Sequence, residues 1–105
     1  MGSIGSRKLN RMLDNLEHIL AIELLCSTQA LSFRKPLKSS AILEACLALT
    51  RESIEFITED RIFAEDIKAA AEIVVKGALV NTAHQAVVKN NIELDIPFME
   101  EFSLY

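Results

Sequence analysis

The stretch from Ser6 to Phe33, SRKLNRMLDNLEHILAIELLCSTQALSF, decides the fold of this chain. Apolar residues recur in it at spacings of three and four, which marks one face of an α-helix; they are Leu9, Met12, Leu13, Leu16, Ile19, Leu20 and Leu24. From Leu16 onward a second face also becomes apolar, through Ala21, Ile22, Leu25 and Ala30. A helix that is apolar on most sides is buried in something larger. The pattern therefore predicts a long helix, half-exposed in its N-terminal half and surrounded in its C-terminal half.

Two further helices are predicted after this one. Pro36 ends the first helix, because proline disfavours helical geometry at Lys35 and lacks an N–H donor. Ser39 or Ser40 then supplies the N-cap oxygen of a second helix. Its expected inward stripe is Ile42, Cys46, Leu49, Ser53 and Phe56 or Ile57. A third helix starts near Ala64 and ends at Asn90-Asn91, with Glu65 and Asp66 in its first turn, where negative charge is favourable.

The tail after residue 90 has a different pattern. Ile92, Leu94 and Ile96 alternate with polar residues or proline, which suits an extended arm. It is either a frayed terminus or an arm that docks on a neighbouring subunit. The fold class predicted is all-α: three main helices over 6–33, 40–59 and 64–89, forming a long antiparallel bundle segment, with an extended tail over 91–105. We expect one segment, 1–105, rather than several domains.

Composition supports helix and excludes several classes of partner. Half of the 105 residues are apolar, with only three Gly and two Pro to punctuate a many-stranded sheet. The net charge is −4 and no basic patch is visible, so we expect no nucleic-acid partner. No stretch approaches the roughly 20 apolar residues of a membrane helix, and no secretory signal is seen. Cys26 and Cys46 are expected to be reduced core thiols, which favours a cytoplasmic location.

A search for chemistry finds no self-contained site. His18 and His84 are far apart in sequence, and neither belongs to a metal-binding pattern. Glu17 and His18 are adjacent, so on a helix they point in different directions and cannot act as a pair. The three glycines, at positions 2, 5 and 77, form no phosphate-binding loop. The sequence thus predicts no catalytic, cofactor-binding or metal-ligating residue.

One ordered set of short motifs is more specific than composition. It comprises Ser6-Arg7-Lys8-Leu9, Asn15-Leu16-Glu17, Leu20-Ala21-Ile22-Glu23-Leu24-Leu25, Gln29-Ala30-Leu31, Phe33-Arg34, Pro36-Leu37-Lys38, Glu59-Asp60-Arg61, Phe63 and Asp66-Ile67. In this order the set resembles the C-terminal region of the aromatic amino acid ammonia-lyases, and the histidine enzymes more than those acting on phenylalanine or tyrosine. The resemblance also accounts for Met1-Gly2-Ser3, which otherwise fits a loose myristoylation pattern or a cloning remnant.

The resemblance implies a helical homotetramer with a central bundle, and elimination of ammonia from L-histidine to give trans-urocanate. It also implies a methylidene-imidazolone electrophile made from an Ala-Ser-Gly triplet. This sequence has no such triplet, because its glycines follow Met1, Ile4 and Lys76. No catalytic residue of the family can be placed on any position here, and the family's acidic motif would end just before Met1.

Two hypotheses follow. In the first, the chain is the C-terminal helical fragment of a histidine ammonia-lyase-like enzyme, structural and oligomerising, and inactive alone. Its partners are then further copies or the remaining lyase segments. In the alternative, it is a stand-alone helical oligomerisation or protein-interaction module derived from a lyase. Either way we expect the first helix at the interface, and Asp at Leu20 or Leu24 to dissociate or unfold the protein, because a buried unpaired carboxylate is costly.

Overall fold

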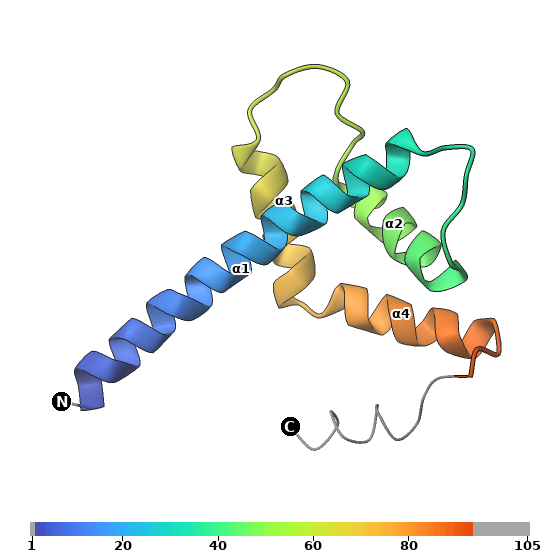
Figure 1. Ribbon diagram of the computed structural model, residues 1–105. Coiled ribbons are helices and arrows are strands. Elements are labelled where there is room, and N and C mark those ends of the chain that lie inside the picture. Colours follow the sequence, from blue (N-terminus) through green and yellow to red (C-terminus); the bar gives the residue numbers. More distant parts are fainter. Residues whose placement is uncertain (1, 94–105) are drawn as a thin grey trace.

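The computed structural model describes residues 2–93 of the chain, and in that range the only regular secondary structure is helical. Four helices follow one another: α1 (Gly2–Phe33), α2 (Ala41–Ser53), α3 (Ala64–Val75) and α4 (Ala78–Lys89) (Figure 1). The all-α prediction is confirmed. Most of the predicted tail, from residue 94 onward, lies outside the described residues.

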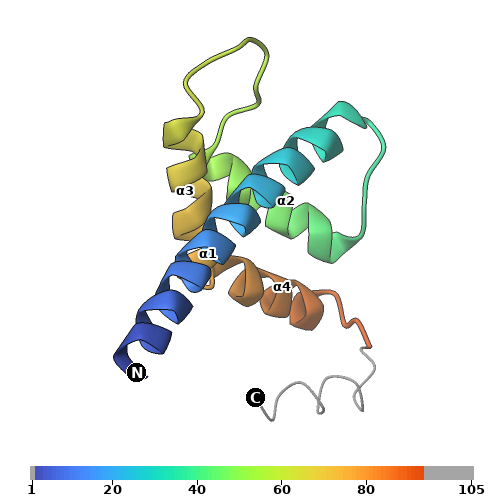
Figure 2. The ribbon, with the colours of Figure 1, turned by 60° about the vertical axis from the view of Figure 1, so that its left-hand side comes forward.

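The first helix is longer than predicted and only half of it is packed. It begins at Gly2, four residues earlier than expected, and ends at Phe33, before Pro36 as predicted. Its C-terminal half crosses α3, which is its main contact. Its N-terminal half projects beyond the other helices (Figures 1 and 2). All residues from Gly2 to Leu20 are exposed.

The second helix is shorter than predicted. Ser40 is the N-cap, and its Oγ accepts a hydrogen bond from the Leu43 N–H (3.2 Å). The helix ends at Ser53 rather than near residue 59, because Ile54 takes an extended conformation with φ −129° and ψ 114°. Burial of the Ile54 side chain, 1% exposed, accompanies this change of direction. The expected range 40–59 was wrong at its C-terminal end.

The predicted third helix, 64–89, is two helices. Gly77 has a φ of +69°, the left-handed conformation in which helices commonly end. The Gly77 N–H donates to the Val74 carbonyl (3.2 Å), and α4 restarts at Ala78 in a new direction. After the break α4 packs mainly on α2, whereas α3 packs mainly on α1. A continuous helix over these residues could not pack against both α1 and α2.

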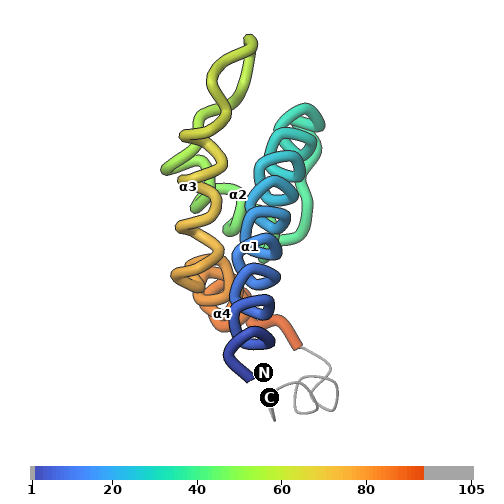
Figure 3. The backbone as a smooth tube through the Cα atoms, turned by 90° about the vertical axis from the view of Figure 1, so that its left-hand side faces the viewer, coloured from blue at the N-terminus to red at the C-terminus, as the bar shows by residue number. Residues whose placement is uncertain are grey.

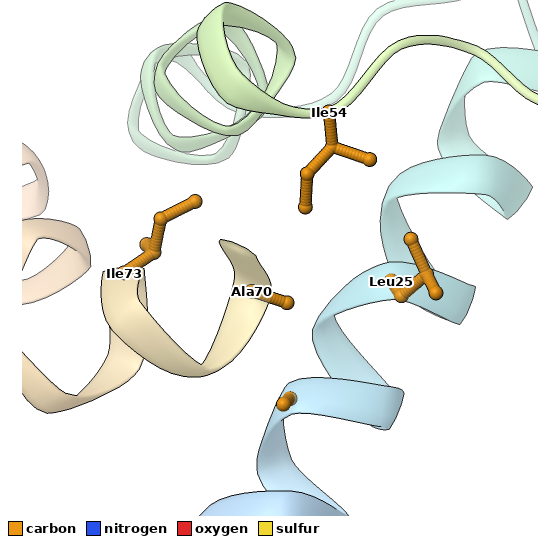
Figure 4. Packing of buried hydrophobic residues seen from close by; sticks show 5 residues of the cluster. Leu25, Ile54, Ala70 and Ile73 are labelled. Atoms are coloured by element: carbon orange, nitrogen blue, oxygen red, sulfur yellow. The ribbon is translucent and has the colours of Figure 1, made fainter. Parts of the chain in front are cut away.

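The core is small and lies where α1, α3 and the residue after α2 meet. It consists of Ala21, Leu25, Ile54, Ala70 and Ile73. Ile54 points between α1 and α3, towards Leu25 and Ala70 (Figure 4). Ala21 and Ala70 are fully buried, so the two helices approach each other through residues without bulk.

The inward stripe predicted for the second helix was partly wrong. Its most buried residues are Leu47 and Thr50, at 8% and 0% exposure, whereas Ser53 is exposed. Ile42, Cys46 and Leu49 are half-buried. The buried face is therefore turned by about one residue, because α2 packs against α4 rather than along the whole of α1.

The molecule is flat and open. Its principal extents are 54 × 44 × 17 Å, and Figure 3 shows α1 and α3 side by side across the thin direction. The radius of gyration is 16.5 Å, compared with about 13 Å for a compact domain of this length. Among the residues described here, many large apolar side chains on the four helices are therefore exposed.

Candidate interaction surface

The N-terminal half of α1 carries an apolar stripe that stays exposed in the part of the chain that the structure describes. Its members are Leu9, Met12, Leu13, Leu16, Ile19 and Leu20, which are between 39% and 66% exposed. We call these six residues the α1 stripe. At 100° per residue they lie within about a third of the helix circumference, as in the helices that dock on a partner.

The α1 stripe faces away from the core. Ala21, Leu25 and Thr28 form the buried face of the same helix. The helical repeat places this buried face about 140° around the axis from the stripe. One helix thus has two apolar faces, of which residues 2–93 cover only one. Arg11 and Asn15 lie on the polar side between them and are exposed.

A second apolar surface is a groove of about 520 Å³ beside the C-terminal half of α1. It lies between that helix, the connection after α2 and the start of α3. Its lining residues are Ile22, Leu25, Cys26, Gln29, Ala30, Phe33, Ile57, Phe63 and Ile67. The groove is almost wholly apolar, so it offers a packing surface and lacks the convergent polar groups that orient a small substrate.

Polar contacts hold the connection after α2 against α1. The Gln29 side chain donates to the Ile57 carbonyl (2.8 Å) and accepts from the Ile57 N–H (3.2 Å), in the way of a strand pair. Arg51 donates to the carbonyls of Thr28 (3.3 Å) and Ile54 (3.2 Å) and to Ser32 Oγ. These bonds satisfy the carbonyls of Ile54 and Ile57, which lie outside the helices, and hold the extended connection against α1.

Arg51 is the polar centre of this junction. Its guanidinium lies 5.5 Å from the centroid of the Phe56 ring. Phe56 also packs edge-to-face on Phe33, with centroids 5.4 Å apart. Burial, and then the charge of Arg61, lower the pKa of Arg51 from its ordinary value. The three carbonyl and hydroxyl acceptors show that Arg51 is used structurally, in joining α1 to α2.

Arg61 anchors the other end of the connection. It makes a bidentate ion pair with Asp66 in the first turn of α3 (2.9 and 3.0 Å) and donates to the Glu55 carbonyl (3.0 Å). The expected position of Asp66 in the first helical turn is confirmed. Neither this network nor the Gln29–Ile57 pair was anticipated from sequence. Arg61 lies before α3 and so shares no helix face with Asp66, and Gln29 and Ile57 are 28 residues apart.

The ionisable residues considered from sequence are not brought together. His18 and His84 are both exposed, on α1 and α4. Across residues 2–93 no three side chains of His, Cys, Asp or Glu are grouped as a metal site would require. The expectation that this chain has no catalytic residue stays a prediction. No helix within the same range is long and apolar enough to span a membrane.

The two cysteines occupy different environments and are not bridged. Cys26 is exposed and lines the groove, so its expected place in the core was wrong. Its position on the helix is apolar in pattern, but none of the four described helices covers that face. Cys46 is half-buried, with Sγ 3.8 Å from the Leu79 carbonyl, and burial raises the pKa of its thiol.

Comparison with known proteins gives a consistent result. The family described as "Aromatic amino acid lyase" matches residues 1–52. Histidine ammonia-lyase of Natranaerobius thermophilus is 40% identical over 87 residues, which cover 83% of this chain and 17% of that protein. The same-named proteins of Psychromonas ingrahamii and Sorangium cellulosum are 43% and 42% identical over 76 and 87 residues. These regions cover 72% and 83% of this chain, but 15% and 17% of the two proteins.

The chain therefore spans about a sixth of the length of these curated relatives. None of the solved structures matches it.

Proposed function

Residues 1–52 place this chain in the aromatic amino acid lyase family, and from that premise we propose that it is the C-terminal helical segment of a histidine ammonia-lyase-like protein, with a structural and oligomerising role. The observation that carries the proposal is the α1 stripe, six large apolar side chains exposed on one face of a projecting helix. Covering such a face provides the main driving force for association. The partners are further copies of the chain or the remaining lyase segments.

The chemistry of the family would then be supplied by other polypeptide. The Ala-Ser-Gly triplet from which its electrophile forms does not occur in this sequence, so no residues here fit that group. The groove beside α1 has an apolar lining without convergent charged groups. We propose that the chain alone does not convert L-histidine to trans-urocanate. The unbridged thiols also favour a cytoplasmic location.

The catalytic part of the proposal is tested by an absorbance assay. The purified chain is incubated with L-histidine and followed at the ultraviolet band of urocanate, with a complete histidine ammonia-lyase as positive control. We expect no product above the buffer blank. Turnover by the chain alone would overturn the assignment of a purely structural role.

The association part is tested by light scattering coupled to size-exclusion chromatography. We expect a mass above that of the 11.7 kDa monomer. Leu16→Asp should lower that mass to the monomer's while the helical circular dichroism is kept, because Leu16 makes no core contact and is 49% exposed. Asn15→Asp adds the same charge on the polar side of α1 and is the matched control. A monomeric parent chain would contradict the oligomerising role.

A further inference from the structure

We propose that residues 94–105 bind to a hollow at the start of α2 of the same chain. The binding does not require the proposed oligomerising role and involves a different surface from the α1 stripe. Three observations support it: the lining of the hollow, the composition of the segment, and the place where the segment leaves α4.

The hollow lies where the chain passes from α1 to α2 and has a volume of about 580 Å³. Its lining residues are Leu31, Lys35, Pro36, Leu37, Lys38, Glu44 and Leu47. Leu47 is buried, at 8% exposure, whereas Leu37 is 75% exposed. Lys35 and Lys38 are also exposed. The hollow thus combines apolar walls with a basic edge, and such a site suits an apolar side chain with carboxylates beside it.

The positive charges around the hollow have no acidic partner among the described residues. Arg34, Lys35 and Lys38 are all exposed, and the one ion pair in that part of the chain lies at the start of α3. The carboxylate at the hollow belongs to Glu44, and it accepts a hydrogen bond from the Ser39 N–H (2.8 Å). Glu44 is thus engaged with the backbone before α2, and the three cations are available to an acidic segment.

Residues 94–105, LDIPFMEEFSLY, have the complementary composition. Three of them are acidic, Asp95, Glu100 and Glu101, and none is basic. The segment is also rich in large apolar side chains, which are Leu94, Ile96, Phe98, Met99, Phe102, Leu104 and Tyr105. Opposite charges select the partner and its register, and burial of the apolar side chains provides the driving force.

The end of α4 determines where this segment begins. The Ile92 N–H donates to the Val87 carbonyl (3.1 Å), and the Asn91 N–H donates to the Val88 carbonyl (3.3 Å). With Asn91 at a positive φ of 53°, these two bonds form the Schellman motif, which ends a helix in a defined direction. Ile92 is half-buried. The chain is therefore held in place up to the residue before Glu93.

This end of α4 lies beside the first turn of α2. Ala41 and Asn90 line one small pocket together, although they are far apart in sequence. Figures 1 and 2 both show the start of α2 next to the end of α4. The segment that follows α4 thus starts on the helix turns that also carry the hollow.

The path from the end of α4 to the hollow is short. Glu44 and Leu47, which line the hollow, lie about 90° around the α2 axis from Ala41. On a helix about 11 Å wide this is about 9 Å of surface, with about 7 Å along the axis. An extended chain covers about 3.3 Å per residue, so the five residues from Glu93 to Phe98 span up to about 17 Å. Phe98 can therefore reach the hollow.

Binding within one chain is favoured over binding between two chains. A short tether keeps the segment at an effective concentration on the order of millimolar beside the hollow. Separate chains at micromolar concentration do not compete with this. The segment of a second copy would bind only if its own hollow were out of reach, and the geometry at the end of α4 places that hollow within reach.

Zero-length cross-linking of the full chain tests the contact directly. A carbodiimide joins a lysine to a carboxylate only where the two touch, and peptide mass spectrometry then identifies the joined residues. An equal mixture of unlabelled and isotope-labelled chains is used at micromolar concentration. We expect Lys35 and Lys38 to be joined to carboxylates of residues 94–105, in peptides that are wholly labelled or wholly unlabelled.

Lys8 is the control lysine for this experiment. It is exposed like Lys35 and Lys38, but it lies on the projecting half of α1, about 38 Å along the helix from Phe33. We expect little linkage between Lys8 and residues 94–105.

Charge reversal provides an independent test with a graded result. Phe98→Trp gives the chain its only tryptophan, and acrylamide quenching of its fluorescence reports exposure. Adding Lys35→Glu and Lys38→Glu should lower the ratio of bound to free segment by about tenfold and so raise the quenching constant. High salt should act in the same direction. Lys8→Glu with Lys68→Glu changes the net charge equally at two exposed positions and is the matched control.

Circular dichroism checks that every variant keeps its helices. Linkage within single chains, with quenching raised by the Lys35 and Lys38 reversals but not by the control pair, supports binding to the hollow. No linkage, linkage to Lys8 at the same frequency, or equal quenching in the two charge variants would overturn it. Peptides that join labelled to unlabelled chains would overturn binding within one chain and show exchange between copies instead. The mass measured by light scattering tests the oligomerising role separately.

Discussion

At the scale of single residues, Ile54 is the largest fully buried apolar side chain among the described residues. Its side chain is 1% exposed between α1 and α3, and its backbone is extended at the point where α2 ends. Arg51 donates to its carbonyl and so fixes the backbone from the other side (3.2 Å). Ile54 therefore links the end of α2 to the core that α1 and α3 share.

Ile54→Ala should lower the free energy of unfolding by about 2–4 kcal/mol, because it removes a buried side chain and leaves a cavity in a small core. The measurement is urea unfolding followed by circular dichroism at one fixed protein concentration. Ile62→Ala is the matched control, since Ile62 is 81% exposed, and its effect should stay within about 0.5 kcal/mol. Equal effects of the two substitutions would contradict the assignment of Ile54 to the core.

Cys46 should react with an alkylating agent at higher pH when the chain is folded than when it is unfolded. Burial raises the pKa of its thiol, so the reactive thiolate forms later in the native state. Because the pKa is raised in the folded state, folding favours the protonated thiol of Cys46. The stability that this thiol contributes is present at low pH and is lost as the pH rises through the raised pKa. Rates are measured on Cys26→Ser with and without denaturant; identical pH profiles would contradict the prediction.

At the scale of elements, the break between α3 and α4 decides the path of the second half of the chain. A helical pattern continues from Ala64 to Lys89, but Gly77 adopts φ +69° and the two halves pack on different partners. Lys76 and Gly77 donate to the carbonyls of Glu72 and Val74, which closes α3 (3.0 and 3.2 Å). Gly77 thus ends α3 and changes the direction of the chain within a continuous helical sequence pattern.

Gly77→Ala should destabilise the fold by about 1–2 kcal/mol, because a left-handed conformation is strained for a residue with a Cβ. Space is not the cause, since a Cβ at this position would meet nothing within 4 Å. Gly77→Asn should cost less, because Asn tolerates the left-handed region. Gly5→Ala, inside α1, should instead stabilise the protein by about 0.5–1 kcal/mol. Urea unfolding of the three variants checks the order.

At the scale of the whole molecule, α1 has two different tasks along its length. Its C-terminal half joins α3 and the residue after α2 in the core, and its N-terminal half presents the α1 stripe to the outside. If the chain associates as we propose, folding and association depend on different faces of one helix. Substitutions on the two faces should separate the two properties.

Leu24→Asp should unfold the chain, whereas Leu20→Asp should mainly dissociate it. Leu24 packs against the core and is half-buried, so a carboxylate there is desolvated without a partner. Leu20 is 39% exposed and belongs to the α1 stripe. Circular dichroism reports folding, and light scattering reports mass. Loss of helix in both variants at the same level would contradict the division of α1 into a packed and a free face.

Sequence alone determined the all-α class, the end of α1 before Pro36, the N-cap of α2 and the family. These features are local: apolar residues recur every three or four positions, Ser40 is an N-cap and Pro36 follows Phe33. Each depends only on residues that are neighbours in the sequence. It also showed that no Ala-Ser-Gly triplet is present. Tertiary structure alone decided which apolar face is covered. Leu13 and Leu25 look alike in the pattern, yet one is 48% and the other 9% exposed.

The physical reason is that sequence periodicity shows which face of a helix is apolar, but it does not show which element packs against that face. The extended turn at Ile54, the break at Gly77 and the contacts of Arg51 arise from packing between elements distant in sequence. Local helix propensity differs by less than about 1 kcal/mol per residue, and burial of one isoleucine outweighs it. The ends of the helices and the free stripe of α1 therefore became visible only in three dimensions.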